Sequence, residues 1–517
     1  MNTTDFLSIS TAICPQREAI VFEGNRITYE QLSLSVNQLA NALIKLGLKK
    51  GDVAAFLQVN CPECLETYFA CAKLGVIYQP LNFRAKQDEL EFLLQHAGAR
   101  AVLAGNRYLG MVKNVLPRLP ALKHIISLEN REPDALFYAD LIKDSPADEV
   151  FAEIEDDDIT ILMYTAGTTG KPKGVPLRHS GFISYVLQNV DPVSPDISEK
   201  NILTMPLYHV AGIQSMLAAV YGGRTLVLMR QFEIEEWFKT IEKEKVNRAM
   251  LVPTMLKYVV DHPDFAKHDL SSLKVITYGA APMPFEVITK AIRLLPWVQF
   301  INAFGQTETA STIAALGPED HVLQGSEEEK EKKLRRLTQS IGRPLPDVEV
   351  KIVDDAGKEV PRGEAGDIVA RGPRIMTGYW QDEEKTKQAF TPDGWLITKD
   401  KGWMDEDGYI FLMGRGDDII IRAGENIAPG EIENVLAEHP AVEEAAVIGA
   451  PDEEWGQVPV AVVVLKKGNS ATEKEMIEHC HSKLASFKRP TRVCFVDELP
   501  RNTLGKILKN ELRERFS

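Results

Sequence analysis

The chain contains the stretch Tyr164-Thr165-Ala166-Gly167-Thr168-Thr169-Gly170-Lys171-Pro172-Lys173-Gly174-Val175, which follows the apolar, β-prone run Ile159–Met163. A strand that leads into a loop rich in glycine, threonine and lysine offers backbone N–H groups, hydroxyls and ammonium charge to a polyphosphate. Glycine also lets the backbone come close to the anion. The stretch therefore predicts a phosphate-binding loop, and the alternative is a mobile glycine-rich loop with solvated lysines.

The loop is not of the Walker A type. That motif has a longer spacing between its first glycine and a Gly-Lys-Ser/Thr element. Here two residues separate Gly167 from Gly170, and Pro172 follows Lys171. A phosphate loop of another class is therefore expected.

Length and composition indicate a globular protein with more than one domain. At 517 residues the chain is too long for one ordinary hydrophobic core. The net charge of −15 argues against nucleic acid and anionic membranes as partners. The residues Met1–Asp5 lack the features of a signal peptide, and no apolar run has the length of a membrane span. A cytoplasmic protein without a transmembrane segment is expected.

The cysteines predict packing rather than chemistry. Six cysteines in a chain of this length do not form a secreted disulfide scaffold. Cys61 and Cys64 have CxxC spacing, but no second pair or histidine cluster stands near them in the sequence to complete a metal site. The run Cys64–Ala72 instead has the pattern of an amphipathic helix with thiols on its packed side.

Strand-like and helix-like segments alternate through the first part of the chain. Strands are expected at Asp52–Leu57 and Gly75–Leu81, with helices at Glu63–Leu74 and Glu89–Ala97. This alternation predicts βαβ units and parallel sheets, and it recurs from about residue 200 to 305. Later strands such as Val348–Val353 alternate apolar and polar residues, which predicts antiparallel pairing.

The expected fold class is therefore α/β. A large N-terminal domain over residues 1–415 would combine parallel α/β sheets with a β-rich subdomain at about 340–415. A small α+β C-terminal domain would cover residues 416–517, with helices near Pro429–Glu438 and Glu473–Leu484.

The stretch that begins at Tyr164 closely resembles the phosphate-binding signature of the adenylate-forming superfamily, which includes acyl-CoA synthetases, peptide-synthetase adenylation domains and luciferases. The superfamily usually has serine where this chain has Ala166. Further segments resemble the superfamily's other motifs, in the same order and over nearly the whole chain. They are Pro206–Gly212, Tyr278–Met283, Asn302–Thr309, Gly394–Asp400, Gly414–Glu433 and Leu499–Ile507.

The resemblance implies sites for ATP and Mg²⁺ in the large domain. Glu308 would hold Mg²⁺, a hard cation that prefers carboxylate oxygens, and Thr307 would contact phosphate. Asp400 would accept hydrogen bonds from the ribose hydroxyls, and Arg415 would approach the same sugar. Lys399 stands where the superfamily usually has glycine. The other implied nucleotide and phosphate contacts are Thr165, Ala166, Gly167, Thr168, Thr169, Gly170, Lys171, Lys173, Gly279, Ala280, Ala281, Pro282, Asn302, Ala303, Gly305 and Phe304, which replaces a tyrosine.

The resemblance also implies sites for a small carboxylic acid and for coenzyme A. His209 would gate the carboxylate. Its segment lacks the aspartate with which amino-acid-activating domains hold an α-ammonium group, so a fatty, alicyclic or aromatic acid is expected. The acyl pocket would be formed by His209, Val210, Ala211, Gly212 and Tyr278. Coenzyme A would contact Gly424, Trp455, Phe487, Arg489 and Arg84.

By the same resemblance, Lys506 would bridge the acid carboxylate and the α-phosphate, and Asp417 would be the hinge of a mobile C-terminal domain. The implied activity is that of an ATP-dependent carboxylate–CoA ligase, which forms an acyl-adenylate and pyrophosphate and then acyl-CoA and AMP. The alternatives are an acyl-AMP ligase that loads a carrier protein, a luciferase-like oxygenase, and a non-enzymatic sensor of ATP or acyl ligands. A homodimer is left open.

Overall fold

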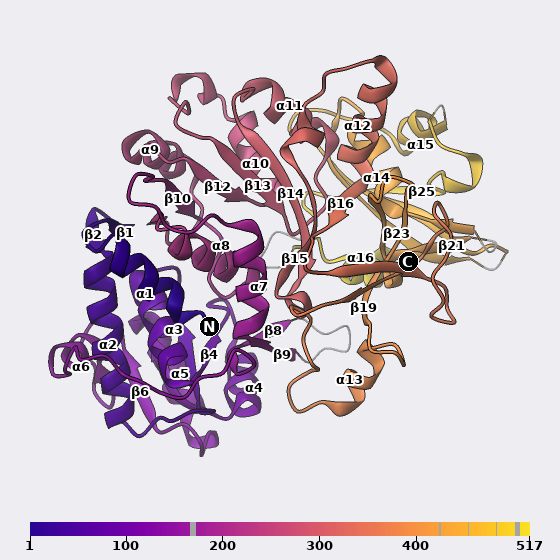
Figure 1. Ribbon diagram of the computed structural model, residues 1–517. Coiled ribbons are helices and arrows are strands. Elements are labelled where there is room, and N and C mark those ends of the chain that lie inside the picture. The colour runs from indigo at the N-terminus through magenta and orange to yellow at the C-terminus, as the bar shows by residue number, and fades with distance from the viewer. Residues whose placement is uncertain (166–171, 423–424, 453, 482, 502–506, 517) are drawn as a thin grey trace.

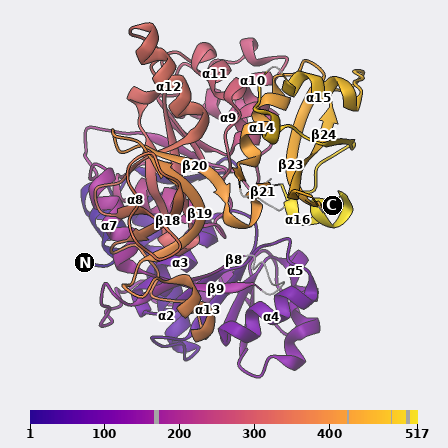
Figure 2. The same cartoon turned by 90° about the vertical axis from the view of Figure 1, so that its right-hand side faces the viewer.

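The computed structural model spans residues 1–517 and describes residues 1–165, 172–422, 425–452, 454–481, 483–501 and 507–516. Figure 1 shows a large lobe, coloured indigo through orange, and a smaller yellow lobe that holds the C-terminal part of the chain. In Figure 2 the small lobe lies beside helix α10 (Pro253–Asp261) of the large lobe. No helix within the described ranges has the length and apolar character needed to cross a membrane.

The N-terminal part of the large lobe is built on a sheet with the strand order β7-β6-β5-β3-β4-β8-β9. The pairs are parallel except for the antiparallel pair of β8 and β9, which confirms the expected βαβ units. The strands are β3 (Val53–Leu57), β4 (Ile77–Pro80), β5 (Ala99–Ala104), β6 (His124–Ser127), β7 (Leu136–Phe137), β8 (Ile159–Thr165) and β9 (Lys173–Arg178). The helices of this part are α1 (Thr4–Ile13), α2 (Tyr29–Lys45), α3 (Pro62–Leu74), α4 (Gln87–Ala97), α5 (Asn106–Val115) and α6 (Tyr138–Lys143).

A second, larger sheet has the order β17-β18-β19-β20-β16-β15-β14-β13-β12-β10-β11-β1-β2. From β14 to β1 its pairs are parallel, and the others are antiparallel. The parallel strands are β1 (Glu18–Phe22), β10 (Lys200–Leu203), β11 (Thr225–Leu228), β12 (Arg248–Leu251), β13 (Val275–Gly279) and β14 (Gln299–Gln306). The added antiparallel strands are β2 (Asn25–Thr28), β15 (Ser311–Leu316), β16 (Ser340–Pro344), β17 (Glu349–Val353), β18 (Gly366–Arg371), β19 (Leu396–Met404) and β20 (Ile410–Arg415). The helices are α7 (His179–Asn189), α8 (Val210–Tyr221), α9 (Ile234–Glu244), α10, α11 (Phe285–Leu294), α12 (Glu327–Gln339) and α13 (Glu383–Ala389).

The β-rich subdomain expected at about 340–415 is not a separate sheet. Strand β15 pairs with β14, and β16 joins β15 to β20, so the antiparallel strands continue the parallel ones. The sequence pattern did not show this continuity, because the partners β16 and β20 are far apart along the chain. The continuous sheet places the ends of β14, β19 and β20 in one structural unit.

The small lobe has the expected α+β composition. Its sheet has the order β22-β21-β24-β23, and β25 pairs in parallel with β24. The strands are β21 (Ile420–Arg422), β22 (Glu425–Ile427), β23 (Val442–Asp452), β24 (Gly456–Leu465) and β25 (Arg492–Phe495). The helices are α14 (Pro429–Ala437), α15 (Glu473–His481) and α16 (Lys509–Phe516).

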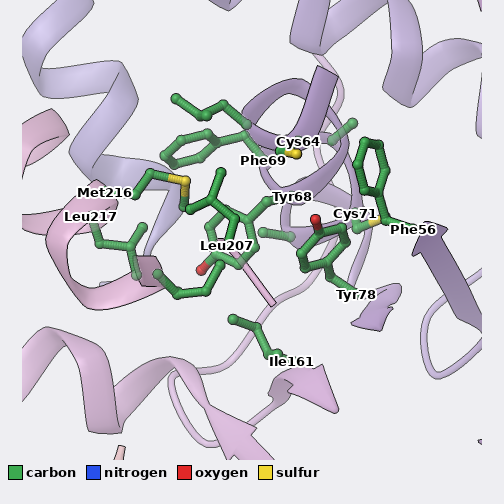
Figure 3. Close-up of a cluster of buried hydrophobic side chains, with 14 of the residues drawn as sticks. Phe56, Cys64, Tyr68, Phe69, Cys71, Tyr78, Ile161, Leu207, Met216 and Leu217 are labelled. Atoms are coloured by element: carbon green, nitrogen blue, oxygen red, sulfur yellow. The ribbon is translucent and has the colours of Figure 1, made fainter. Parts of the chain in front are cut away.

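Helix α3 lies in the middle of the core that joins the two large sheets. Pro62 occupies its first turn, where a missing N–H costs no helical bond, and Gly75 ends it with φ of 66°. Figure 3 shows Phe69 of α3 near Met216 of α8, and Tyr78 of β4 on the other side of the helix. Replacing Phe69 with alanine would cost about 3–5 kcal/mol of stability. This shared core fixes α8 relative to β8.

The cysteines of the CxxC pair are part of that core. Cys61 and Cys64 are buried, and their Sγ atoms lie 3.7 Å apart. Cys71 of the same helix is fully buried. Burial raises the pKa of Cys61 well above its usual value, and the Cys64 thiol adds to this. The packed position expected for these thiols is confirmed.

Candidate functional site

The β8–β9 hairpin holds the two ends of the predicted phosphate loop together. Thr165, the last residue of β8, is the antiparallel partner of Lys173, the first residue of β9. The loop residues Ala166, Gly167, Thr168, Thr169, Gly170 and Lys171 lie outside the described residues. The hairpin brings Lys173 to the point where the loop returns to the sheet.

Lys173 lies in a half-buried, cation-rich position. Burial lowers its pKa, and the nearby Lys399 lowers it further, whereas Glu308 opposes this shift. Its ammonium nitrogen Nζ lies 4.8 Å from the centroid of the Tyr379 ring. It borders a cavity of about 200 Å³, which His96 and the ion pair of Lys385 and Asp382 also line. An anion at this position would relieve the repulsion between the lysines.

The predicted nucleotide-binding segment Gly279–Pro282 and the segment Asn302–Gly305 lie side by side. Strands β13 and β14 pair in parallel, so that Gly279 is the partner of Ala303. A Cβ on Gly279 would lie 2.1 Å from the Ala303 carbonyl oxygen, so only glycine fits. Beyond the strand, Ala280 has φ of 67°, which directs the chain through Ala281 and Pro282. Ligands of open α/β sheets bind beside such carboxyl ends of parallel strands.

Glu308 follows β14 in the short 3-10 helix Thr307–Thr309. Its carboxylate oxygen Oε1 accepts a hydrogen bond of 3.0 Å from the Tyr379 hydroxyl, and its carbonyl accepts one of 2.9 Å from the Met376 N–H. Among the described residues, Oε2 has no hydrogen-bond partner. A carboxylate with one oxygen held and the other available suits a hard cation such as Mg²⁺.

Asp400 and Arg415 are cross-strand partners on β19 and β20. The Arg415 Nε atom lies 3.1 Å from Asp400 Oδ1, and Arg415 Nη1 donates a 2.8 Å hydrogen bond to the Thr398 carbonyl. The same carbonyl accepts a bond of 3.3 Å from Gln306 Nε2. The structure thus joins the predicted ribose-binding pair to the end of β14.

Lys399 adopts the backbone conformation that glycine favours. Its φ is 64°, in the left-handed region. This costs a non-glycine residue about 1 kcal/mol or more. The chain therefore keeps the loop geometry before Asp400 without the glycine that the superfamily usually has there.

His209 is the N-cap residue of α8; it is half-buried, and its Nε2 atom is shielded from solvent. Burial lowers the pKa of its imidazole to about 3, so the ring is neutral at physiological pH. Its Nε2 atom has no hydrogen-bond partner among the described residues. A neutral imidazole with an unsatisfied nitrogen can bond to a polar group of a ligand.

The predicted acyl-pocket residues fall into separate cores. Val210 packs in the core that contains α3, and Gly212 is held against the Pro206 carbonyl. Tyr278 is fully buried in another core, and its hydroxyl shares a 2.8 Å hydrogen bond with His321 Nε2. That these residues line an acyl pocket stays a prediction.

The predicted coenzyme A residues of the small lobe are linked through Arg422, which sequence reasoning missed. The Arg422 guanidinium carbon lies 5.3 Å from the Trp455 ring centroid, and its Nη1 donates to the Phe487 carbonyl over 2.9 Å. Arg489 donates to carbonyls at the end of α15 and beyond it. Arg84 lies in the large lobe, where its Nη2 is 3.5 Å from Gln231 Oε1. Within the described ranges, no hydrogen bond or ion pair joins Arg84 to Trp455.

The remaining predictions concern the linker and the last loop. The backbone of Asp417 lies in the short 3-10 helix Gly416–Asp418, between β20 of the large sheet and β21 of the small one. Gly424 and Lys506 lie outside the described residues.

The site also contains residues that the sequence did not single out. Tyr379 contacts both Glu308 and Lys173. Gln214 of α8 is buried, its Oε1 accepts from the Thr312 hydroxyl, and its Nε2 has no partner within the described ranges. The only sequence feature that could have indicated a role for Tyr379 is its place in an aromatic pair after a glycine. Gln214 is a single glutamine in an apolar helix, and nothing in the sequence indicates a role for it.

Comparison with known proteins agrees with this geometry. Residues 10–380 match the family model of the AMP-binding enzyme, and residues 431–506 match that of the AMP-binding enzyme C-terminal domain. A fatty acid–[acyl-carrier-protein] ligase of Streptomyces coeruleorubidus is 35% identical over 97% of this chain and 94% of its own length. A feruloyl-CoA synthase of Amycolatopsis is 35% identical over 97% of this chain and 96% of its own.

Solved structures extend the likeness to three dimensions. The anthranilate CoA ligase AuaEII in complex with anthranoyl-AMP matches 100% of this chain and 97% of its own, with a TM-score of 0.90 and 29% identity. ATP-bound MatB from Rhodopseudomonas palustris matches with a TM-score of 0.88 and 29% identity, over 100% and 99% of the two chains. The chain belongs to the AMP-binding enzyme family of the adenylate-forming superfamily.

Proposed function

We propose that this protein is an ATP-dependent carboxylate–CoA ligase. The observation that carries the proposal is the shared Thr398 carbonyl, which accepts hydrogen bonds from both Arg415 and Gln306. This carbonyl connects the Asp400–Arg415 pair, which would bind ribose, to the end of β14. Glu308, which would hold a phosphate-bound cation, directly follows that strand. A nucleoside triphosphate is the ligand whose sugar and phosphates fit that pairing.

In the first half-reaction, a carboxylate oxygen of the acid bonds to the α-phosphorus of ATP, and the bond from that phosphorus to the bridging oxygen breaks. Pyrophosphate leaves and an acyl-adenylate remains. The acid and the triphosphate are both anionic, so catalysis depends on positioning and charge neutralisation. Lys173 and the loop after Thr165 would bind the leaving phosphates, and Lys506 would bind the carboxylate and α-phosphate. Mg²⁺, when held by Glu308, would supply further positive charge.

His209 would orient the acid without adding charge. Its lowered pKa keeps the imidazole neutral, so that its unsatisfied Nε2 acts by hydrogen bonding. The apolar residues that follow it on α8 favour a fatty, alicyclic or aromatic acid, and the buried Gln214 adds a polar group on the same helix.

In the second half-reaction, the thiol of coenzyme A attacks the acyl carbon, its proton passes to solvent, and AMP leaves. Trp455 and Phe487, joined through Arg422, would bind the nucleotide end of coenzyme A. We place the domain boundary between residues 415 and 416. The end of β20 at Arg415 and the start of the small sheet at Ile420 support that boundary.

One relative points to a different acceptor of the acyl group. The Streptomyces coeruleorubidus protein is named as a ligase for an acyl-carrier protein, so a carrier-bound thiol is the alternative to free coenzyme A. A non-enzymatic sensor is disfavoured because Lys173, Glu308, Asp400 and Arg415 are all present.

The test is ATP–pyrophosphate exchange over a panel of fatty, alicyclic and aromatic acids, followed by addition of coenzyme A or a phosphopantetheinylated carrier protein. Exchange with at least one acid, then formation of the CoA thioester and AMP, is the expected result. Transfer to the carrier alone would replace coenzyme A as acceptor, and absence of exchange with every acid would refute adenylation.

A further inference from the structure

The segment Met376–Trp380 is fastened to both parts of the nucleotide site by backbone hydrogen bonds. The Met376 N–H donates to the Glu308 carbonyl over 2.9 Å, and the Trp380 N–H donates to the Gly174 carbonyl over 2.8 Å. A Cβ on Gly174 would lie 2.9 Å from the Trp380 Cβ, so the two segments are in close contact. These two hydrogen bonds therefore fix the position of the backbone on both sides of Tyr379.

That side chain, Tyr379, contacts one charged group of each part. Its hydroxyl donates to Glu308 Oε1 over 3.0 Å. Its ring faces the Lys173 ammonium, with Nζ 4.8 Å from the ring centroid, a distance at which a cation is attracted to the ring. An ionised carboxylate only accepts hydrogen bonds, so the Tyr379 hydroxyl is the donor in this contact.

We propose that Tyr379 is a positioning residue for adenylation, whose hydroxyl orients the Glu308 carboxylate for Mg²⁺ and whose ring holds Lys173 for the phosphates. The proposal rests on the proposed function. Without the hydroxyl, the Glu308 carboxylate can rotate. Binding a cation must then also order this carboxylate, and the entropic cost of doing so weakens the binding. Hydrogen bonds to metal-binding carboxylates commonly serve this purpose.

The two roles can be separated by two substitutions. Tyr379→Phe removes the hydroxyl and keeps the ring over Lys173, whereas Tyr379→Leu removes both. The matched control is Tyr138→Phe, which deletes a hydroxyl that donates to a different carboxyl group, that of the buried Glu66 on α3 in the N-terminal part of the large lobe. The control reports the general cost of losing such a bond.

The experiment measures the Mg²⁺ dependence of exchange and, by calorimetry, the binding of α,β-methylene-ATP with Mg²⁺ and with EDTA. For Tyr379→Phe, the half-saturating Mg²⁺ concentration should rise about 10- to 100-fold, as is usual for loss of such a partner. Its binding of the analogue in EDTA should match the wild type. Tyr379→Leu should also bind the analogue more weakly in EDTA. Tyr138→Phe should lower the melting temperature and leave both binding measurements unchanged.

An unchanged Mg²⁺ dependence in Tyr379→Phe would overturn the proposal. So would an equal loss of EDTA binding in the Phe and Leu variants, because that result would indicate packing alone. Calorimetry needs no acid substrate. If the wild type supported no exchange, the proposed function would fail, and the calorimetric data would still decide the role of Tyr379.

Discussion

The Asp400 carboxylate is held beside the Arg415 guanidinium by cross-strand pairing, with 3.1 Å between Oδ1 and Nε. The carboxylate is almost fully buried, and the Asp400 N–H donates to the Thr398 hydroxyl. Because Arg415 also donates to the Thr398 carbonyl, Thr398 of β19 holds both the Arg415 side chain and the Asp400 backbone. The pair is therefore organised before a nucleotide binds, and such preorganisation reduces the entropic cost of binding.

Replacing Asp400 with alanine should weaken ATP binding. Hydrogen bonds to charged groups contribute about 1.5–3 kcal/mol each, so the dissociation constant should rise about 10-fold or more. Calorimetry with α,β-methylene-ATP and with the corresponding triphosphate lacking the ribose hydroxyls checks this. The variant should lose its preference for the ribonucleotide.

The matched control for Asp400 is Asp367→Ala. Asp367 pairs with Lys401 over 3.0 Å on the neighbouring strands β18 and β19. This pair is partly exposed and should contribute little. An Asp367→Ala variant that weakened binding as much as Asp400→Ala would mean that the sheet, and not the ribose contact, is responsible.

The sequence predicted the strands that bear the site because buried parallel strands and glycine-rich turns leave local signals. The apolar run that leads to Thr165 is strand β8, and Gly279 ends strand β13, close to the expected strand end. Lys399 shows why a motif can survive a substitution. Its backbone takes the left-handed conformation, so a change from the usual glycine adds strain without moving Asp400 out of register.

The contacts that link these motifs could not be predicted, because they depend on residues distant in the sequence. Tyr379 stands in no motif that the sequence singled out, and its proposed role depends on how it folds against Glu308 and Lys173. Tyr278 of β13 is fully buried, and its hydroxyl shares a hydrogen bond with His321 Nε2, a contact that no sequence motif indicates. Which face of a buried strand meets the site depends on tertiary packing.

Glu66 should make stability depend on pH. Burial raises the pKa of the Glu66 carboxyl from its usual value of 4.5 to about 7. The hydrogen bond from Tyr138 lowers this pKa and so opposes the effect of burial. The protonated form is therefore favoured in the folded state, and its stabilising contribution is present below pH 4.5 and is lost as the pH rises through 7. Relative to Glu66→Gln, the wild type should lose about 3 kcal/mol between pH 4.5 and 8. Urea unfolding of both proteins at several pH values tests this, and parallel curves would contradict it.

Lys506→Ala should abolish most of the adenylation activity. Removing one aimed cationic donor costs about 10²- to 10³-fold in rate or more. Exchange kinetics at saturating ATP measure the loss. Lys467→Ala, at an exposed turn residue of the same domain, should retain normal rates. Near-normal exchange in the Lys506 variant would remove that residue from the mechanism.

Asp417→Pro should separate the two half-reactions. The residue lies between the large and small sheets, and proline fixes φ near −65°, which would prevent rotation of the small lobe there. The pair of Lys257 and Glu443 links the lobes over 2.5 Å, but a partly exposed pair contributes about 1 kcal/mol at most and would not prevent the motion. Asp417→Pro should therefore keep exchange activity and lose thioester formation, whereas Asp417→Ala should keep both. Single-turnover transfer from preformed acyl-adenylate to coenzyme A measures the second step directly. Equal loss of both half-reactions in the proline variant would indicate damage to the fold and place the hinge elsewhere.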